Sequence, residues 1–321
     1  MEWLFPAFIS AIAASIAVTR LVLNELKRRS ILDLPNQRSS HQHPTPRGGG
    51  IAVVAVIAMC WSVPALHSPI PAALLIGALL LAFLSWIDDL KTVKIIVRLS
   101  AQFAAVILGL FFLDNEGYLL QGLAPKWLDR VFAALVWVWF INLFNFMDGI
   151  DGIASIETMV ISFGITILSI TSPSIAPEPW LSLSILGAAA GFLKSNWPPA
   201  KLFLGDVGSI PLGYILGGLL LLVAMRGAWQ VALILPLYFL LDSTITLCRR
   251  LLRLQPIWRA HKEHFYQKAV SAGKSHAEVT TAVAILGLIL VGLAHLSFGP
   301  PFLPIAAALT LTVSLMMWMV K

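Results

Sequence analysis

The chain has 321 residues, of which 58% are hydrophobic and 12% are charged, whereas a typical soluble domain is about 25% charged. Its mean hydropathy is +0.86 and its formal net charge is +6. A soluble domain of this length needs far more polar surface, so the composition excludes that class and predicts an integral membrane protein. The basic residues interrupt apolar runs and do not cover one soluble face, so nucleic acid is not an expected partner.

Apolar runs of about 20 residues, the length that crosses a bilayer as a helix, recur along the whole chain. They cover residues 3–23, 48–66, 71–87, 96–113, 130–147, 153–171, 179–195, 210–225, 228–247, 277–297 and 302–320. The seventh run is short and flanked by prolines, so the count is 10 or 11. We therefore expect an all-α polytopic membrane protein, built as a single transmembrane domain over residues 1–321.

The orientation follows from the distribution of basic residues between the loops. Of the 22 Lys and Arg residues, all but Lys126, Arg130 and Arg226 fall on one side of the predicted membrane. Basic loops stay in the cytoplasm, so that side is predicted to be cytoplasmic and the amino end periplasmic. No basic residue precedes the first run, which argues against a cleavable signal peptide.

Five aspartates lie at the predicted cytoplasmic ends of helices. Asp88 and Asp89 close the third run, Asp148 and Asp151 lie in NFMDGIDG after the fifth, and Asp206 lies in FLGDVGS before the eighth. One such aspartate is usually a helix cap or part of a solvated turn. Five aspartates from three glycine-containing loops instead suggest a shared site for Mg²⁺, which takes carboxylates, water and phosphate oxygens as ligands.

The same side carries two basic motifs. WRAHKEHFYQKA contains Arg259, His261 and His264, and the two histidines, spaced i, i+3, are expected to share a helix face. PTPRGGG places Arg47 before a glycine run that opens the second span, an arrangement suited to gripping phosphate. A single basic residue in such a loop is explained by topology alone. Acids for a divalent metal beside cations for phosphate predict chemistry on a diphosphate with a lipid partner.

Four motifs in this order carry a resemblance to a known family: PTPRGGG, the DD pair, NLFNFMDGIDG and NWPPAKLFLGDVGS. The chain resembles the polyprenyl-phosphate N-acetylhexosamine-1-phosphate transferases of glycosyltransferase family 4. The similarity runs from residue 45 to about residue 269. It implies an enzyme of the bacterial inner membrane that transfers HexNAc-1-phosphate from a UDP-N-acetylhexosamine to undecaprenyl phosphate and releases UMP.

The resemblance also implies roles for individual residues. Asp206 matches the family's metal ligand for Mg²⁺, with Mn²⁺ as an alternative, and Asp88, with Asp89 beside it, matches the acid proposed to orient or deprotonate the lipid phosphate. The remaining matches are to the active-site loop, to positions that contact uridine and to the basic motif that holds the diphosphate. The active-site loop holds Asn145, Asp148 and Asp151, the uridine positions are Asn196 and Phe203, and the basic motif holds Arg259, His261 and His264. Gly149 and Arg47 are expected to bind substrate as well.

One departure bears on the donor sugar. The peptidoglycan branch of the family has three consecutive histidines where this chain reads HKEH. That difference argues against a muramoyl-pentapeptide substrate, although the phospho-N-acetylmuramoyl-pentapeptide transferase stays as an alternative. The favoured branch uses UDP-GlcNAc or a 6-deoxy donor such as FucNAc or QuiNAc to start O-antigen or related surface glycans.

Two other classes of membrane protein fit the sequence less well. A transporter or lipid flippase usually places its charges near the bilayer midplane, often in internal repeats, whereas here they gather at one surface and no repeat is evident. A CDP-alcohol phosphotransferase needs a DGxxAR start, and DGIDG and DGIASI stand at that place. The mechanism is taken as direct attack, without a covalent enzyme intermediate. The oligomeric state is left open, with a homodimer among the options.

Overall fold

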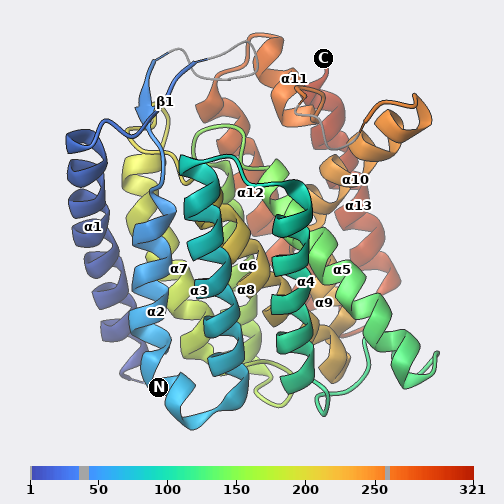
Figure 1. The fold of residues 1–321 in the computed structure, drawn as a ribbon. Helices are drawn as coiled ribbons and strands as arrows, with labels where there is room; N and C mark the ends of the chain where they lie inside the picture. The colour runs from blue at the N-terminus through green and yellow to red at the C-terminus, as the bar shows by residue number, and fades with distance from the viewer. Residues whose placement is uncertain (1, 36–42, 257–260) are drawn as a thin grey trace.

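The computed structural model describes residues 2–35, 43–256 and 261–321, and these fold as a helical bundle with one short β-hairpin (Figure 1). The helices are α1 (Leu4–Arg28), α2 (Gly50–His67), α3 (Pro69–Leu90), α4 (Ile95–Phe112), α5 (Lys126–Phe146), α6 (Ile153–Thr171), α7 (Pro179–Asn196), α8 (Asp206–Val223), η1 (Ala224–Ala228), α9 (Trp229–Ile234), α10 (Leu237–Leu252), α11 (Phe265–Ser271), α12 (His276–Leu296) and α13 (Phe302–Met319). The hairpin pairs β1 (Leu32–Asp33) with β2 (Thr45–Pro46).

The expected all-α polytopic membrane class is confirmed. Each predicted apolar run falls on helical structure, and nine helices of the described residues are long and apolar enough to cross a membrane. The ninth run, 228–247, is not one helix but two, α9 and α10. The break lies at Pro236, which has no N–H to donate into a continuous helix. The count of 10 or 11 spans and the orientation stay predictions.

Helix α8 lies at the centre of the bundle and packs against α3, α5, α2 and α6. Its membrane-length segment is fully buried, whereas that of α1, at the edge of the bundle, is mostly exposed. Trp137 of α5 stacks on Tyr214 of α8 with ring centroids 4.9 Å apart and donates to the Tyr214 carbonyl. Large apolar side chains such as Phe83 and Phe111 point outward, as expected of helices surrounded by lipid.

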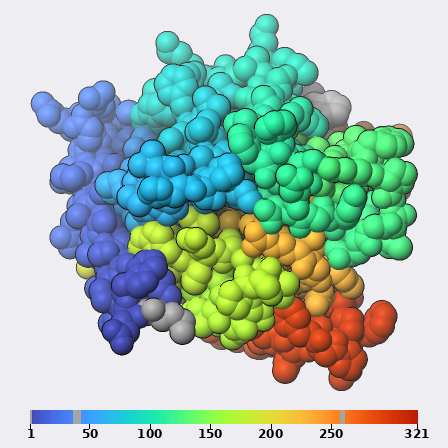
Figure 2. Space-filling model, turned by 90° about the horizontal axis from the view of Figure 1, so that it is seen from below, coloured from blue at the N-terminus to red at the C-terminus, as the bar shows by residue number. Residues whose placement is uncertain are grey.

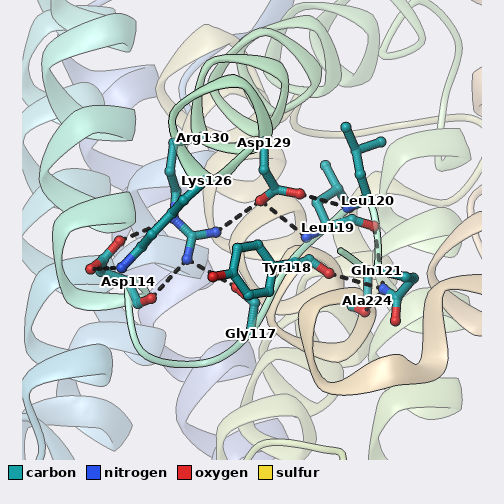
Figure 3. A network of polar contacts seen from close by, with 10 residues as sticks. All are labelled: Asp114, Gly117, Tyr118, Leu119, Leu120, Gln121, Lys126, Asp129, Arg130 and Ala224. Carbon is teal, nitrogen blue, oxygen red and sulfur yellow. Dashed lines mark hydrogen bonds and ion pairs between the residues drawn. The ribbon is translucent and has the colours of Figure 1, made fainter. Parts of the chain in front are cut away.

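The two ends of the bundle differ. One end, drawn at the top of Figure 1, holds the β-hairpin, α11, the start of α2 and the last turn of α3, and we call it the site end. The opposite end carries the loop 113–125, which hydrogen bonds fasten to α5 and to η1 (Figure 3). Figure 2 looks onto this opposite end, where the loop between α6 and α7, in yellow-green, lies near the centre.

Candidate active site

The glycine run after Arg47 brings two motifs of the sequence into direct contact. The backbone of residues 47–50 lies along residues 203–204, with Gly49 N donating to Phe203 O at 2.8 Å and Gly50 N to Leu204 O at 2.8 Å. At Gly50 an added Cβ would lie 2.1 Å from Gly208 Cα. Only glycine permits this crossing of the first turns of α2 and α8. PTPRGGG and GDVGS therefore form one structural unit.

Arg47 links two of the predicted aspartates. Its Nη2 lies 2.8 Å from Asp89 Oδ1 and 2.9 Å from Asp206 Oδ1. Asp206 Oδ1 also accepts from Asn145 Nδ2 at 3.1 Å, and Asp89 Oδ2 accepts from Val207 N in the first turn of α8 at 3.2 Å. The ends of α3, α5 and α8 thus converge on one group of charges, as the sequence predicted for the aspartates of these loops.

Arg98 completes this cluster and was not among the predicted site residues. Its Nη1 lies 2.8 Å from Asp88 Oδ2, and its Nη2 lies 3.7 Å from Asp206 Oδ2. Asp88 also accepts from Val93 N at 2.7 Å. From the sequence alone, Arg98 is only one of the basic residues that set the topology. Its place inside the apolar run 96–113 was the available signal, because a charge within a span needs a partner or a function.

Asp148 adds a fourth carboxylate to the cluster formed by Asp88, Asp89 and Asp206. It lies in the loop between α5 and α6, where burial and then the negative charges of Asp206 and Asp89 raise its pKa well above the usual value. The opposing positive charge of Arg47 only partly offsets this. We call these four aspartates, with Arg47 and Arg98, the acidic cluster.

The acidic cluster fits a divalent cation by charge. Four carboxylates face two guanidinium groups, so that even with Asp148 protonated one negative charge is left unbalanced. Within the described residues no three His, Cys, Asp or Glu side chains converge closely enough to hold a metal by themselves. Mg²⁺ needs only one or two carboxylates and completes its shell with water and phosphate. Asp206, whose side chain keeps 19% of its surface exposed, can offer such a ligand.

Two predicted site residues are instead engaged in bracing the surrounding loops. Asp151 Oδ2 accepts from Ala200 N at 3.0 Å and lies 3.3 Å from His276 Nδ1. Asn196, 3% exposed, accepts from Ser155 Oγ and donates to Leu202 O. Both side chains join the 198–205 loop to the start of α6. These contacts stabilise the loops, and the roles of Asp151 and Asn196 at the site stay predictions.

Two further predicted site residues, Phe203 and Gly149, lie in the loops that carry the cluster. Phe203 is partly buried, and its backbone pairs with residues 46–49. Gly149 follows Asp148 and lies against Tyr266 of α11, so closely that an added Cβ would be 2.1 Å from the Tyr266 hydroxyl. That hydroxyl donates to Phe146 O at 2.9 Å. Tyr266 therefore connects α11 to the loop that carries Asp148.

The histidine motif lies beside this connection. The His264 ring stacks between those of His261, with centroids 5.0 Å apart, and Tyr266, at 5.6 Å. The expectation that the two histidines share a helix face is wrong, because α11 begins only at Phe265 and residues 261–264 are not helical. Their rings nevertheless meet by stacking. Arg259, the third member of the motif, lies outside the described residues.

Known proteins similar to this chain are transferases of one family. The family model for glycosyl transferase family 4 matches residues 71–224, which include the acidic cluster except Arg47. A probable undecaprenyl-phosphate N-acetylglucosaminyl 1-phosphate transferase of Bacillus subtilis is 27% identical over 295 residues, covering 88% of this chain and 82% of that protein. The undecaprenyl-phosphate alpha-N-acetylglucosaminyl 1-phosphate transferase of Escherichia coli K12 is 26% identical over 304 residues, covering 87% and 79%.

A mycobacterial protein is similar to this chain as well. The decaprenyl-phosphate N-acetylglucosaminephosphotransferase of Mycolicibacterium smegmatis is 27% identical over 307 residues, covering 83% of this chain and 75% of that protein. The family model and these relatives, together with the four motifs in order, support the assignment of this chain to the polyprenyl-phosphate N-acetylhexosamine-1-phosphate transferase family. The named relatives are phosphotransferases, which supports an enzyme in this membrane-spanning helical fold.

Proposed function

We propose that the protein transfers N-acetylhexosamine-1-phosphate from a UDP-N-acetylhexosamine to undecaprenyl phosphate, giving undecaprenyl-diphosphate-HexNAc and UMP. UDP-GlcNAc is the first donor to test, because the relatives are named for N-acetylglucosamine. The 6-deoxy donors and a role in starting O-antigen or another surface glycan are the finer part of the proposal. We place the enzyme in the bacterial inner membrane with its site end toward the cytoplasm, where nucleotide sugars are made.

The observation that carries the proposal is the charge imbalance of the acidic cluster. Two anionic reactants repel each other, and a site that joins them must supply positive charge in a fixed geometry. Asp206 would hold Mg²⁺, which when bound neutralises charge on the diphosphate of the donor. Arg47 and Arg98 already lie within 4 Å of the carboxylates that would surround it. Mn²⁺ has the same ligand preference for oxygen and is the expected substitute.

The chain's own groups would then orient the two reactants. Asn145 fixes the Asp206 carboxylate through its amide, which itself donates to Ser209 Oγ at 2.8 Å. Arg98 bridges Asp88 and Asp206, so a lipid phosphate held near Asp88 would lie close to the donor diphosphate. An oxygen of the lipid phosphate attacks the β-phosphorus, and the bond from that phosphorus to the UMP oxygen breaks. The atoms balance without a covalent enzyme intermediate.

The test uses purified protein, undecaprenyl phosphate, Mg²⁺ and a panel of UDP-N-acetylhexosamines, with UMP release as the measurement. We expect UMP from at least one donor, loss of UMP release in EDTA, and recovery with Mg²⁺ or Mn²⁺. Asp114→Asn, at the opposite end, is the matched control for an aspartate outside the site. Absence of UMP with every donor, together with substrate counter-flow in proteoliposomes, would favour a transporter and overturn the proposal.

A further inference from the structure

Helix α4, which carries Arg98, lies at the edge of the bundle beside α3 and α5 (Figure 1). Most of its residues are not buried, and those that are form one face at helical spacing: Gln102, Ala105, Val106, Gly109 and Leu110. Arg98 precedes Gln102 by four residues and so lies on the same face. Of the residues of α4, all of which the structure describes, Gln102 is the only buried polar one, at 2% exposed. A buried amide within a membrane span needs a partner inside the protein.

The partner of Gln102 is Asn142 of α5. Asn142 Nδ2 donates to Gln102 Oε1 at 2.7 Å, and Gln102 Nε2 donates back to Asn142 Oδ1 at 3.4 Å. Asn142 Nδ2 also donates to Val138 O of its own helix at 2.8 Å, which limits the rotation of its side chain. Because each amide both donates and accepts, sliding or rotating α4 along α5 would break both bonds in apolar surroundings, where such a loss is costly.

Helix α5 is the fixed member of this pair, because it is fastened to the central helix α8 at two levels. Trp137 stacks on Tyr214 and donates to its carbonyl. Asn145, three residues after Asn142 and on the same side of α5, donates to Asp206 Oδ1 at 3.1 Å and to Ser209 Oγ at 2.8 Å. The amide pair therefore ties α4 to a helix that is already bonded to the acidic cluster.

Gln102 also adjoins the ion pair that Arg98 forms. Asp88, Arg98 and Gln102 line the same small cavity of about 10 Å³ between α3, α4 and α8. Above it, Arg98 Nη1 lies 2.8 Å from Asp88 Oδ2, and Arg98 Nη2 lies 3.7 Å from Asp206 Oδ2. Asn145 donates to the other oxygen of Asp206, so the alignment of α4 with α5 determines how the two side chains together hold this carboxylate.

We propose that Gln102 is a positioning residue for the transfer reaction: through its amide pair with Asn142 it fixes α4 against α5 and so holds Arg98 between Asp88 and Asp206. This inference rests on the proposed function. Gln102 touches no substrate and carries no charge, so its effect on the reaction passes through Arg98. A shift of about 1 Å in a catalytic group can lower a rate by about 100-fold, and the amide pair lies one helical turn from Arg98.

The test compares wild type with Gln102→Met/Asn142→Leu, which replaces both amides by apolar side chains of similar shape. No amide is left unpaired, so the variant should fold with a Tm close to that of wild type. We expect kcat/KM for UMP release to fall by about 10-fold. The loss should divide between kcat and the KM for undecaprenyl phosphate as it does in Arg98→Ala. A folded double variant with wild-type kcat/KM, or with a different division of the loss, would overturn the inference.

Gln102→Asn is a milder variant that protects the test from a folding defect. It keeps an amide at this position but shortens the side chain by one methylene group, so the bonds to Asn142 cannot both form without a shift of α4. We expect kcat/KM to fall in the same direction as in the double variant. Wild-type kcat/KM in Gln102→Asn would also contradict the inference.

Two controls show whether the effect passes through Arg98. Adding Gln102→Met/Asn142→Leu to Arg98→Ala should cost no further activity, and a further loss would contradict the proposal. Thr166→Val/Ser182→Ala removes a buried contact of 2.8 Å between α6 and α7, far from Arg98, and should leave kcat/KM unchanged. A 10-fold loss there would mean that any loosened helix contact lowers activity, which removes the special role of Gln102. Wild type that releases no UMP would refute the proposed function as well, whereas active wild type beside an equally active double variant refutes this inference alone.

Discussion

The two ends of the bundle both carry aspartates beside arginines, yet they are built differently. At the opposite end, Asp114 and Asp129 face Lys126 and Arg130, so the charges balance (Figure 3). Asp129 is fully buried and also accepts from Leu119 N and Leu120 N. Every charge there has a protein partner, and the result is a clamp that fastens the loop 113–125 to α5.

At the site end, the acidic cluster has four carboxylates and two guanidinium groups. The difference shows in the loop aspartates: hydrogen bonds from Lys126 and Arg130 lower the pKa of Asp114, whereas burial and nearby carboxylates raise the pKa of Asp148. A balanced group of charges stabilises a fold, and an unbalanced one is arranged for a charge that comes from outside. The balance of charges at each end is therefore a better indicator of the reactive site than the mere presence of charged residues.

The largest expected effect is on turnover. Asp206→Asn should lower kcat for UMP release by about 10²-fold or more, as removal of a main electrostatic stabiliser usually does. Asp206 has hydrogen-bond or ion-pair contacts with Arg47, Asn145 and Arg98, so the amide can keep part of the packing while losing the charge. Near-normal, Mg²⁺-dependent UMP release by the variant would remove Asp206 from the role of metal ligand.

Substitution of one arginine at each end distinguishes an effect on activity from an effect on stability. Arg98→Ala should lower kcat/KM by about 10-fold to 100-fold, because it removes the cation that lies between Asp88 and Asp206. Arg130→Ala should lower stability by about 1–3 kcal/mol, since it removes bonds to Asp114, Asp129 and the Gly117 carbonyl. Activity assays and thermal unfolding in detergent distinguish the two. The reverse pattern would show that the ends have been assigned wrongly.

Asp148 gives a prediction on stability and pH. Its raised pKa means that the folded protein retains a proton over a pH range in which the unfolded chain has lost it, so stability falls as pH rises through that range. Asp148→Asn removes this cost, and we expect the free energy of unfolding to rise by about 1–2 kcal/mol at pH 7 without added metal. The gain should vanish near pH 3, where the unfolded aspartate is also protonated. Thermal unfolding without Mg²⁺ at the two pH values measures it, and a gain equal at both would refute the cause.

The sequence alone was enough to predict much of this arrangement. The features that it could not predict depend on contacts between residues that lie far apart in the chain. Apolar runs located the helices, and loop aspartates predicted which ends converge, because both are local properties. Arg98 was missed because the positive-inside rule explains any basic residue on that side. A motif does not show that Ala200 N and Leu202 O are the partners of Asp151 and Asn196.

The histidine motif illustrates the same limit. The i, i+3 spacing of His261 and His264 predicts a shared helix face, but hydrogen bonds from His264, Phe265 N and Tyr266 N to Asp242 fix the helix start after the pair. Asp242 lies 22 residues earlier in the chain than His264, and local periodicity carries no information on such a contact. Pro236, by contrast, was a local signal for the break between α9 and α10.

The smallest expected effect tests whether the opposite end is independent of the chemistry. Asp114→Asn should change stability by no more than about 0.5 kcal/mol, because its side chain is 41% exposed and exposed ion pairs contribute little. The change should shrink further at high salt, and turnover should equal that of wild type. Thermal unfolding at low and high salt, with UMP release on the same samples, measures both quantities. A clear loss of turnover in Asp114→Asn would mean that the clamp is coupled to the acidic cluster across the bundle, and a balanced group of charges could then no longer be taken as purely structural.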